Sequence, residues 1–113
     1  MASAIPLNTF KTIIANVTTS ANVIYTCPPG ITTVVLLAQV SNIDNVNTVN
    51  VTAAHKRGAN TTRLIANAQS PIQDAASLLM GKLVLETGDG FSIQANANDS
   101  AEITLSILET ADA

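Results

Sequence analysis

The sequence predicts an all-β protein, a single antiparallel β-sandwich of about seven to eight strands with a jelly-roll-like arrangement. Three observations predict this class. Of the 113 residues, 34 are Val, Ile or Thr, the β-branched residues that favour strands. Turn-forming Asn, Asp, Gly and Pro recur at intervals of roughly 8–12 residues, the spacing typical of sandwiches and barrels. Several segments also alternate apolar and polar residues with a period of two, as half-buried strands do.

The first half of the chain contains four expected strands separated by clear turns. The polar run TTSAN, the break Pro28-Pro29-Gly30 and the run NIDN each interrupt the chain. The strand after Gly30 is apolar on both faces, which fits either a strand covered on both faces or a strand with one face on the core and the other on a partner subunit. The four strands are expected at Phe10–Val17, Val23–Cys27, Thr33–Ser41 and Val46–His55.

The second half is clearest near its end, where apolar residues alternate regularly. Residues 67–71 are expected to form a loop, and residues 73–80 an extended path with a short turn at 74–76. The run Thr87–Gly90 has the turn chemistry of a hairpin, because Gly and Asp tolerate positive φ. The strands expected here are Thr61–Ala66, Lys82–Glu86, Phe91–Ala97 and Glu102–Thr110.

The alternation also predicts the core and the domain organisation. Residues 1–8 are expected to form an N-terminal arm, since Pro6 argues against a helix there, and residues 9–113 a single sandwich domain. The side chains expected to be buried are Val35, Leu37, Val49, Val51, Leu83, Leu85, Ile93, Leu105 and Ile107.

Composition argues against several classes of function. With thirteen charged residues and a net charge of −3, the chain lacks the excess of basic residues that nucleic-acid binding needs. The longest apolar run, Val34–Ala38, is far shorter than the roughly 20 residues that span a bilayer. One His and one Cys supply neither a catalytic set nor a metal site, so we expect no enzyme activity, no metal and no cofactor. The start of the chain has no secretory signal pattern, so synthesis in a cytoplasm is expected.

One cluster of positive charge has two interpretations. It consists of His55, Lys56, Arg57 and, a few residues on, Arg63. As a binding feature it would contact an acidic neighbour or a polyanionic sugar. As a structural feature it is a solvated turn whose charges favour solubility.

Three segments together resemble a known group of proteins. They are CPPGITTVVLLAQVSN, DAASLLMGKLVLETGDGFSIQA and AEITLSILET, which contain the turn Pro29-Gly30, the apolar strand Val34–Val40, the run Gly81–Asp89 and the alternating strand Glu102–Glu109. They resemble small β-sandwich structural proteins of tailed bacteriophages, especially those that infect cyanobacteria. The resemblance covers nearly the whole chain and brings no catalytic residues with it.

The resemblance implies a non-enzymatic virion subunit, made in the host cytoplasm. A capsid decoration or cement subunit is the expected role, because a small single domain suits a clamp repeated over a shell. A tail, baseplate or fibre component and a receptor- or carbohydrate-binding module are the alternatives. The expected partners are other copies of the chain and other virion proteins, with a host-surface glycan as a further candidate. Three copies around one axis is the expected number. Besides the basic cluster, the residues expected to make partner contacts are Ala2, Ile5, Pro6 and Leu7.

Overall fold

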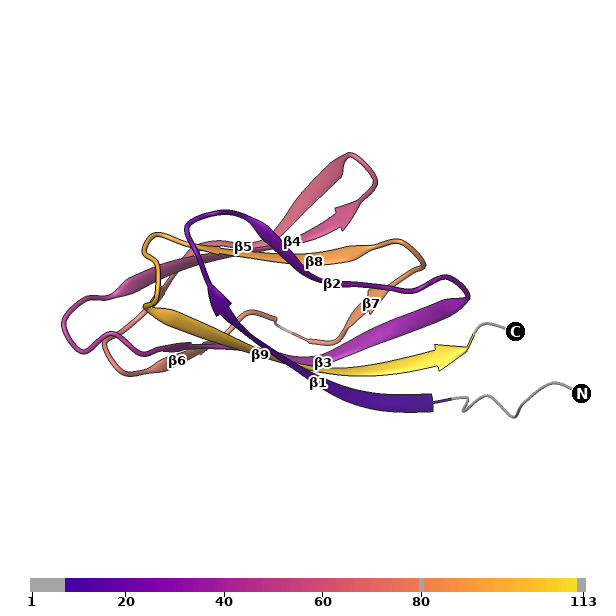
Figure 1. The fold of residues 1–113 in the computed structure, drawn as a ribbon, viewed down its shortest axis with the longest axis horizontal. Helices are drawn as coiled ribbons and strands as arrows, with labels where there is room; N and C mark the ends of the chain where they lie inside the picture. The colour runs from indigo at the N-terminus through magenta and orange to yellow at the C-terminus, as the bar shows by residue number, and fades with distance from the viewer. Residues whose placement is uncertain (1–7, 80, 112–113) are drawn as a thin grey trace, which may run out of the picture.

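The computed structural model describes residues 8–79 and 81–111. These residues form nine antiparallel strands (Figure 1). The described residues include no helix. The predicted all-β antiparallel sandwich is therefore confirmed, and the strand beyond the predicted count is β6, in the segment expected to be extended. The strands are β1 Asn8–Val17, β2 Asn22–Thr26, β3 Ile31–Asn42, β4 Val49–Arg57, β5 Asn60–Ser70, β6 Ala75–Ser77, β7 Leu83–Leu85, β8 Gly90–Ala95 and β9 Ala101–Ala111.

The strands form two sheets that pack face to face. The five-stranded sheet has the order β1-β9-β3-β6, and β7 pairs with the same strand β3 as β6 does. The four-stranded sheet has the order β2-β8-β4-β5. In Figure 1 the four-stranded sheet is the upper layer and the five-stranded sheet the lower one. The chain passes repeatedly from one layer to the other, so β4 and β5 are the one pair of consecutive strands that bond to each other in the described chain.

This topology corrects the expectation of a hairpin at Thr87–Gly90. The turn itself is present: Gly88 has φ 87° and the Asp89 N–H donates to the Glu86 carbonyl at 2.9 Å. However, β7 pairs with β3 in one sheet, and β8 pairs with β2 and β4 in the other. The turn is therefore a crossover between the two layers, which local turn chemistry cannot distinguish from a hairpin.

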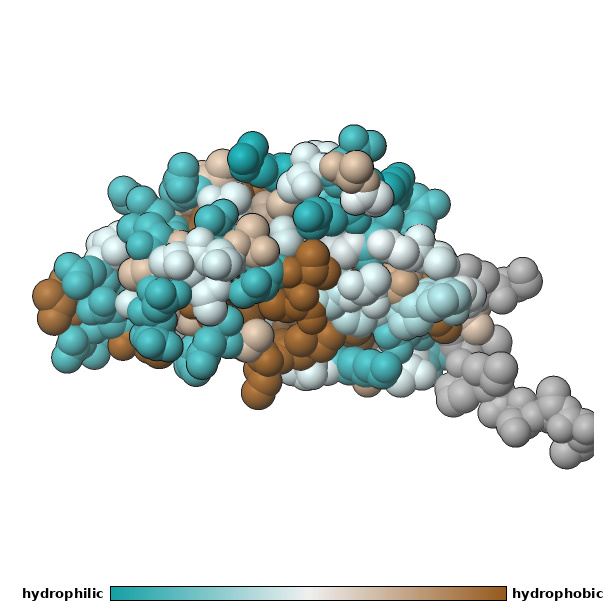
Figure 2. All heavy atoms as spheres, turned by 45° about the horizontal axis from the view of Figure 1, so that its top comes forward, coloured by the Kyte–Doolittle hydropathy of each residue, from teal (hydrophilic) through white to brown (hydrophobic). Residues whose placement is uncertain are grey.

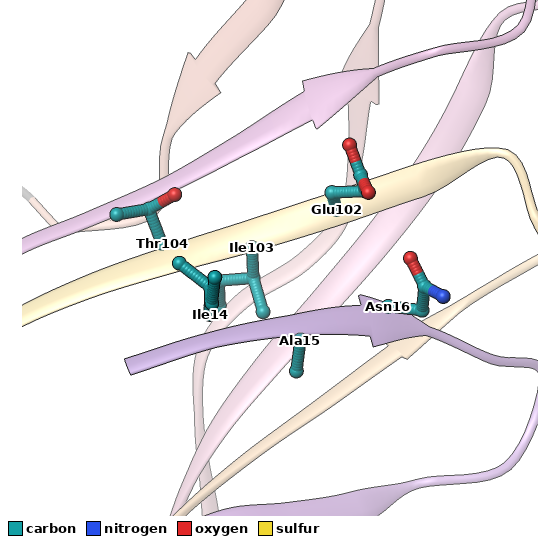
Figure 3. Close-up of a pocket in the computed structure, with 6 residues that line it drawn as sticks. All are labelled: Ile14, Ala15, Asn16, Glu102, Ile103 and Thr104. Carbon is teal, nitrogen blue, oxygen red and sulfur yellow. The ribbon is translucent and has the colours of Figure 1, made fainter. Parts of the chain in front are cut away.

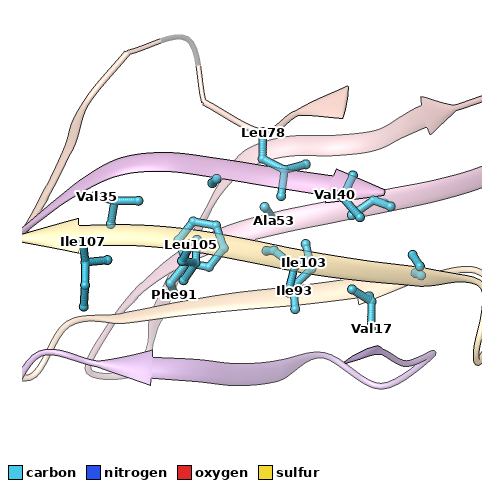
Figure 4. Close-up of a cluster of buried hydrophobic side chains, with 14 of the residues drawn as sticks. Val17, Val35, Val40, Ala53, Leu78, Phe91, Ile93, Ile103, Leu105 and Ile107 are labelled. Carbon is cyan, nitrogen blue, oxygen red and sulfur yellow. The ribbon is translucent and has the colours of Figure 1, made fainter. Parts of the chain in front are cut away.

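The core lies between the sheets and is almost entirely aliphatic (Figure 4). Its aromatic member is Phe91, which is fully buried beside Leu105 and Ile93. The predicted burial is confirmed at seven positions, which are Val35, Val49, Val51, Leu85, Ile93, Leu105 and Ile107.

The other two predicted core positions differ in the structure. Leu37 is 40% exposed, because the register between β3 and β9 shifts between Val35 and Leu37. That bulge turns both Leu36 and Leu37 outward and returns Ala38 to the core. Leu83 is only half-buried, because it opens a three-residue strand at the margin of the sheet.

Strand β5 runs through residues 67–70, where a loop was expected. A register irregularity between β4 and β5 accommodates Asn67, whose φ is 51° and whose N–H donates to the Thr52 hydroxyl at 3.0 Å. The strand ends at Ser70, directly before Pro71. The expected turn at 74–76 is also displaced: the Asp74 N–H bonds the Pro71 carbonyl, and residues 75–77 are already β6.

Strand β4 begins at Val49, three residues later than expected. The Asp44 side chain accepts hydrogen bonds from the N–H groups of Val46 (2.8 Å) and Asn47 (3.0 Å). These local bonds hold the segment as a turn, a competition with strand pairing that is common for Asp.

The predicted arm falls almost entirely outside the described residues. Its four predicted contact residues lie outside the described part of the chain, namely Ala2, Ile5, Pro6 and Leu7, so their contacts stay a prediction. Asn8, the last residue of that arm, is the first residue of β1.

Candidate functional site

The structure divides the basic cluster between the two faces of the four-stranded sheet. His55 and Arg57 point toward Asp89 at one end of the sandwich, and His55 lies beside Phe91 in the strand register. Lys56, the next residue after His55 in β4, lies on the other face of the sheet. Arg63 on β5 is exposed and pairs with Ala54, which lies on the same face as Lys56. The four residues therefore do not form one patch. Whether any of them contacts a partner stays a prediction.

Asp89 anchors the first of two polar groups at this end of the sandwich. Its side chain is 2% exposed and accepts hydrogen bonds from Arg57 Nε at 2.9 Å and Nη2 at 2.6 Å. His55 Nε2 lies 3.0 Å from the same carboxylate, and the Glu86 N–H donates to it at 2.9 Å. Arg57 also pairs with exposed Glu86 at 2.6 Å. The crossover from β7 to β8 is thereby tied to the end of β4.

Glu109 anchors the second polar group, on the five-stranded sheet. Lys11 Nζ lies 2.7 Å from its carboxylate, and the Tyr25 hydroxyl donates to it at 2.5 Å. Tyr25 also shares a hydrogen bond of 2.8 Å with the Thr33 hydroxyl. These contacts join β1, β2, β3 and β9.

Cys27 connects the two groups. Its N–H donates to the Asp89 carbonyl at 2.8 Å, and its sulfur accepts from the Thr33 hydroxyl at 3.3 Å. It is buried, as expected of a small apolar residue. In the described part of the chain, no buried side-chain nitrogen or oxygen lacks a hydrogen-bond partner. The two groups therefore form a closed polar network that joins both sheets.

The partners shift the pKa values in this network. The hydrogen bonds from Arg57 hold the pKa of Asp89 well below its usual range, and Asp89 in turn raises the pKa of Arg57. The Lys11 bond, followed by the Tyr25 bond, lowers the pKa of Glu109. Burial, followed by the bond to Glu109, raises the pKa of Tyr25 above its usual value.

These shifts predict how stability depends on pH. Because Asp89 and Glu109 have lowered pKa values in the folded state, their contribution is complete above the unfolded values of about 4 and is lost as acid protonates them. Tyr25 has a raised pKa, so its contribution is complete below about pH 10 and is lost above that. We expect the free energy of unfolding to be nearly constant between about pH 5 and 10 and to fall on both sides. Urea titrations at a series of pH values measure this, and an unchanged midpoint at about pH 3 would contradict it.

The outer face of the five-stranded sheet carries a row of apolar side chains. In the strand register Phe10 lies opposite Leu108, Leu108 opposite Val34, and Val34 opposite Val84. We call these four residues the apolar stripe. Phe10 is 73% and Val84 53% exposed, and the two middle residues are half-buried. The stripe crosses four strands without a polar interruption.

More apolar side chains adjoin the stripe on the same face. They are Ile14, Leu36 and Leu37, all exposed. Ile14 adjoins a shallow hollow of about 320 Å³ between β1 and β9, lined also by Asn16, Glu102 and Thr104 (Figure 3). Glu102 is the one charged residue among the described strand residues of this face. A face with this little charge and this much exposed apolar area is typical of a protein contact.

The outer face of the four-stranded sheet is more polar. Its hollows are lined mainly by Asn, Thr, Gln and Ser side chains, together with Arg63. Figure 2 brings this sheet forward and shows mostly hydrophilic surface, with a larger apolar area at the lower middle and a smaller one at the left end of the molecule. The two sides of the sandwich therefore differ in chemistry.

Sequence reasoning expected a covered apolar face on the strand that carries Val34, but it missed the extension of the stripe to β1, β9 and β7, and it missed the role of Asp89. The stripe had a signal: Leu108 and Val84 are apolar residues on the outward phase of their strands, where the pattern calls for polar ones. No sequence signal indicated the role of Asp89, because Asp is common in Gly-containing turns whether or not it makes long-range contacts.

The described residues contain no group of three or more His, Cys, Asp and Glu side chains placed to hold a metal ion. No helix suited to crossing a membrane was found among them.

Comparisons with known proteins identify similar folds. No family model matches the chain, and no curated protein matches it. A chain from Bacillus endospore appendages, described as disulfide-linked pili, is 14% identical with a TM-score of 0.55, over 99% of both chains. A pentameric capsid protein from metagenomic phage sequences is 20% identical with a TM-score of 0.45, over 89% of this chain and 62% of that one. The TNF Eiger of S. frugiperda is 17% identical with a TM-score of 0.44, over 80% and 66%. The first of these shows that the sandwich fold as a whole occurs in a solved structure.

Proposed function

We propose that the chain is a non-enzymatic structural subunit of a tailed-phage particle, and specifically a decoration or cement subunit of the capsid. The observation that carries the proposal is the apolar stripe Phe10–Leu108–Val34–Val84 on a nearly uncharged sheet face. A surface of this kind is stabilised when another protein covers it. In this role the stripe lies against the shell, and the polar face of the four-stranded sheet points away from it.

The sequence resemblance to small phage sandwich proteins supports the same role. The described turn at Pro29-Gly30, with φ 72° at Gly30, and the long strand β3 are two of the features on which that resemblance depends. The proposal further includes synthesis in the host cytoplasm and a final location in the virion.

The absence of enzyme activity is part of the proposal. The two buried carboxylates, Asp89 and Glu109, are each engaged by neighbouring side chains in hydrogen bonds or ion pairs. A catalytic acid or base needs a proton acceptor or donor site open to substrate. The network instead joins strands of the two sheets.

A jelly-roll topology is also part of the proposal. The orders β1-β9-β3-β6 and β2-β8-β4-β5 support it, because early and late strands are interleaved in both sheets. Double-sheet jelly rolls, built from two Greek keys, are common in viral capsid proteins.

Val84→Glu is expected to reduce incorporation into particles at least tenfold. The substitution places a charge at the exposed end of the stripe, where docking would have to desolvate it. The protein should still fold, because exposed substitutions usually change stability by less than about 0.5 kcal/mol. Quantitative mass spectrometry of gradient-purified phage particles measures incorporation.

Thr61→Glu on exposed β5 is the matched control, with the same added charge on the other sheet. It should be incorporated like the unsubstituted protein. Equal incorporation of both variants, or absence of the unsubstituted chain from particles, would contradict the proposal. A chain found on tails rather than heads would support the alternative role as a tail, baseplate or fibre component.

One observation favours a second candidate, a carbohydrate-binding module. A hollow of about 190 Å³ on the four-stranded sheet is lined by the amides of Asn50, Asn67, Gln94 and Asn96. Amide groups both donate and accept, as sugar hydroxyls require. Specific binding on a glycan array, abolished by Asn67→Ala, would support this function.

A further inference from the structure

We infer that β1 pairs edge to edge with β1 of a second copy of this chain, antiparallel and around a two-fold axis at Thr12. Free strand edges expose unpaired N–H and C=O groups and pair readily with other chains. This pairing does not depend on the proposed function.

The edges other than β1 all carry features that oppose pairing. At one side of the four-stranded sheet, β2 has five residues and a register shift between Val23 and Tyr25. At the other side, β5 is interrupted by two register shifts against β4 and by the positive φ of Asn67. At the far side of the five-stranded sheet, β6 and β7 have three residues each. Short length and bulges are the usual protections of sheet edges.

Strand β1 lacks these protections. It pairs with β9 over ten residues in one continuous register, and no described strand pairs with its other side. It contains no Pro and one charged residue, Lys11, which is already paired with Glu109 at 2.7 Å. Its outer face carries Phe10 and Ile14, at 73% and 75% the most exposed large apolar side chains among the described residues.

The sequence of β1 is complementary to itself when reversed. Centring the pair on Thr12 places Phe10 of each copy opposite Ile14 of the other, and Thr12 opposite Thr12. Aromatic with β-branched pairs and Thr with Thr pairs are favourable across strands. Lys11 meets Ile13, so no two charges face each other. Because β1 fits itself in this way, the strand that pairs with its free edge is assigned to a second copy of the chain.

The sheet surface on the β9 side of Ile14 is hollowed. This hollow of about 320 Å³ between β1 and β9 is lined by Ile14, Asn16 and Thr104, among others (Figure 3). A Phe10 side chain arriving from the second copy lies beside Ile14 on this same face. The two sheets then become one continuous sheet, and both apolar stripes lie on the same side of it.

The pairing predicts a dimer of the full chain at micromolar concentration, whereas the sequence led us to expect three copies around one axis. Thr12→Glu and Thr12→Lys should each weaken the dimer at least tenfold, because like charges then meet on the axis. An equimolar mixture of the two variants should recover a heterodimer, because the charges are then opposite. Sedimentation equilibrium of each sample and of the mixture measures this. Ser106→Glu, on β9 directly beside Thr12 and away from the edge, is the matched control and should leave dimerisation unchanged.

A cross-linking experiment tests the register without adding charge. Opposite Cβ atoms in antiparallel strands are about 4.5–5.5 Å apart, close to the spacing of a disulfide. Thr12→Cys should therefore form a covalent dimer on oxidation. Asn16→Cys, exposed on the same face of β1 but opposite Asn8 in this register, should not. A monomer or a trimer in sedimentation, no recovery in the mixture, or equal cross-linking of both cysteine variants would each overturn the inference.

Discussion

Replacing Leu105 with alanine is expected to lower the free energy of unfolding by about 2–5 kcal/mol. Leu105 is fully buried in the middle of β9 and packs between the sheets beside Phe91 (Figure 4). The substitution removes its transfer free energy and leaves a cavity that two stiff sheets cannot close. Urea denaturation followed by circular dichroism measures the loss.

The neighbouring residue on β9 provides the control. Ser106 has the opposite phase and lies on the outer face, so Ser106→Ala should change stability by less than about 0.5 kcal/mol. A cost below about 0.5 kcal/mol for Leu105→Ala would mean that the faces of β9 are assigned in the wrong phase, since a slip of one residue exchanges them.

Asp89→Asn is expected to destabilise the fold by about 1.5–3 kcal/mol, the range for losing hydrogen bonds to a charged group. The amide has nearly the same shape but cannot accept from both Arg57 nitrogens and the Glu86 N–H as a carboxylate does. The variant should also lose part of the decline in stability below about pH 5, because that decline includes the protonation of Asp89.

Asp99→Asn is the matched control. Asp99 is an exposed turn residue with φ 59°, a conformation that Asn adopts as readily as Asp. It should unfold like the unsubstituted chain. Equal midpoints for the Asp89 and Asp99 variants at pH 7 would show that the contacts of Asp89 contribute nothing to stability.

The fold class could be predicted because apolar residues recur with a period of two along the inward face of β8 and β9. Ile103, Leu105 and Ile107 point inward as their spacing predicts. The same rule fails at Leu37, because a single bulge in β3 reverses the phase and nothing in the local residues marks it. It also fails for the crossover at Thr87–Gly90, where long-range pairing decides between a hairpin and a change of sheet.

The candidate site was harder to predict because it depends on neighbours in space. Arg57 and Asp89 are 32 positions apart in the chain, and their contact follows from the adjacency of β4 and β8. The apolar stripe likewise joins residues from four strands, each of which carries only one member. Once the strand order is known, both features follow from the register.

The most direct test of the central claim is a density map of a whole phage particle at a resolution that places the two sheets. We expect the chain on the particle with the five-stranded sheet, and with it Val84 and Val34, against a protein neighbour, and with the amide-lined face of the four-stranded sheet toward solvent. A map with the apolar stripe facing solvent, or without density for the chain on the particle, would contradict the claim that this face is the assembly surface.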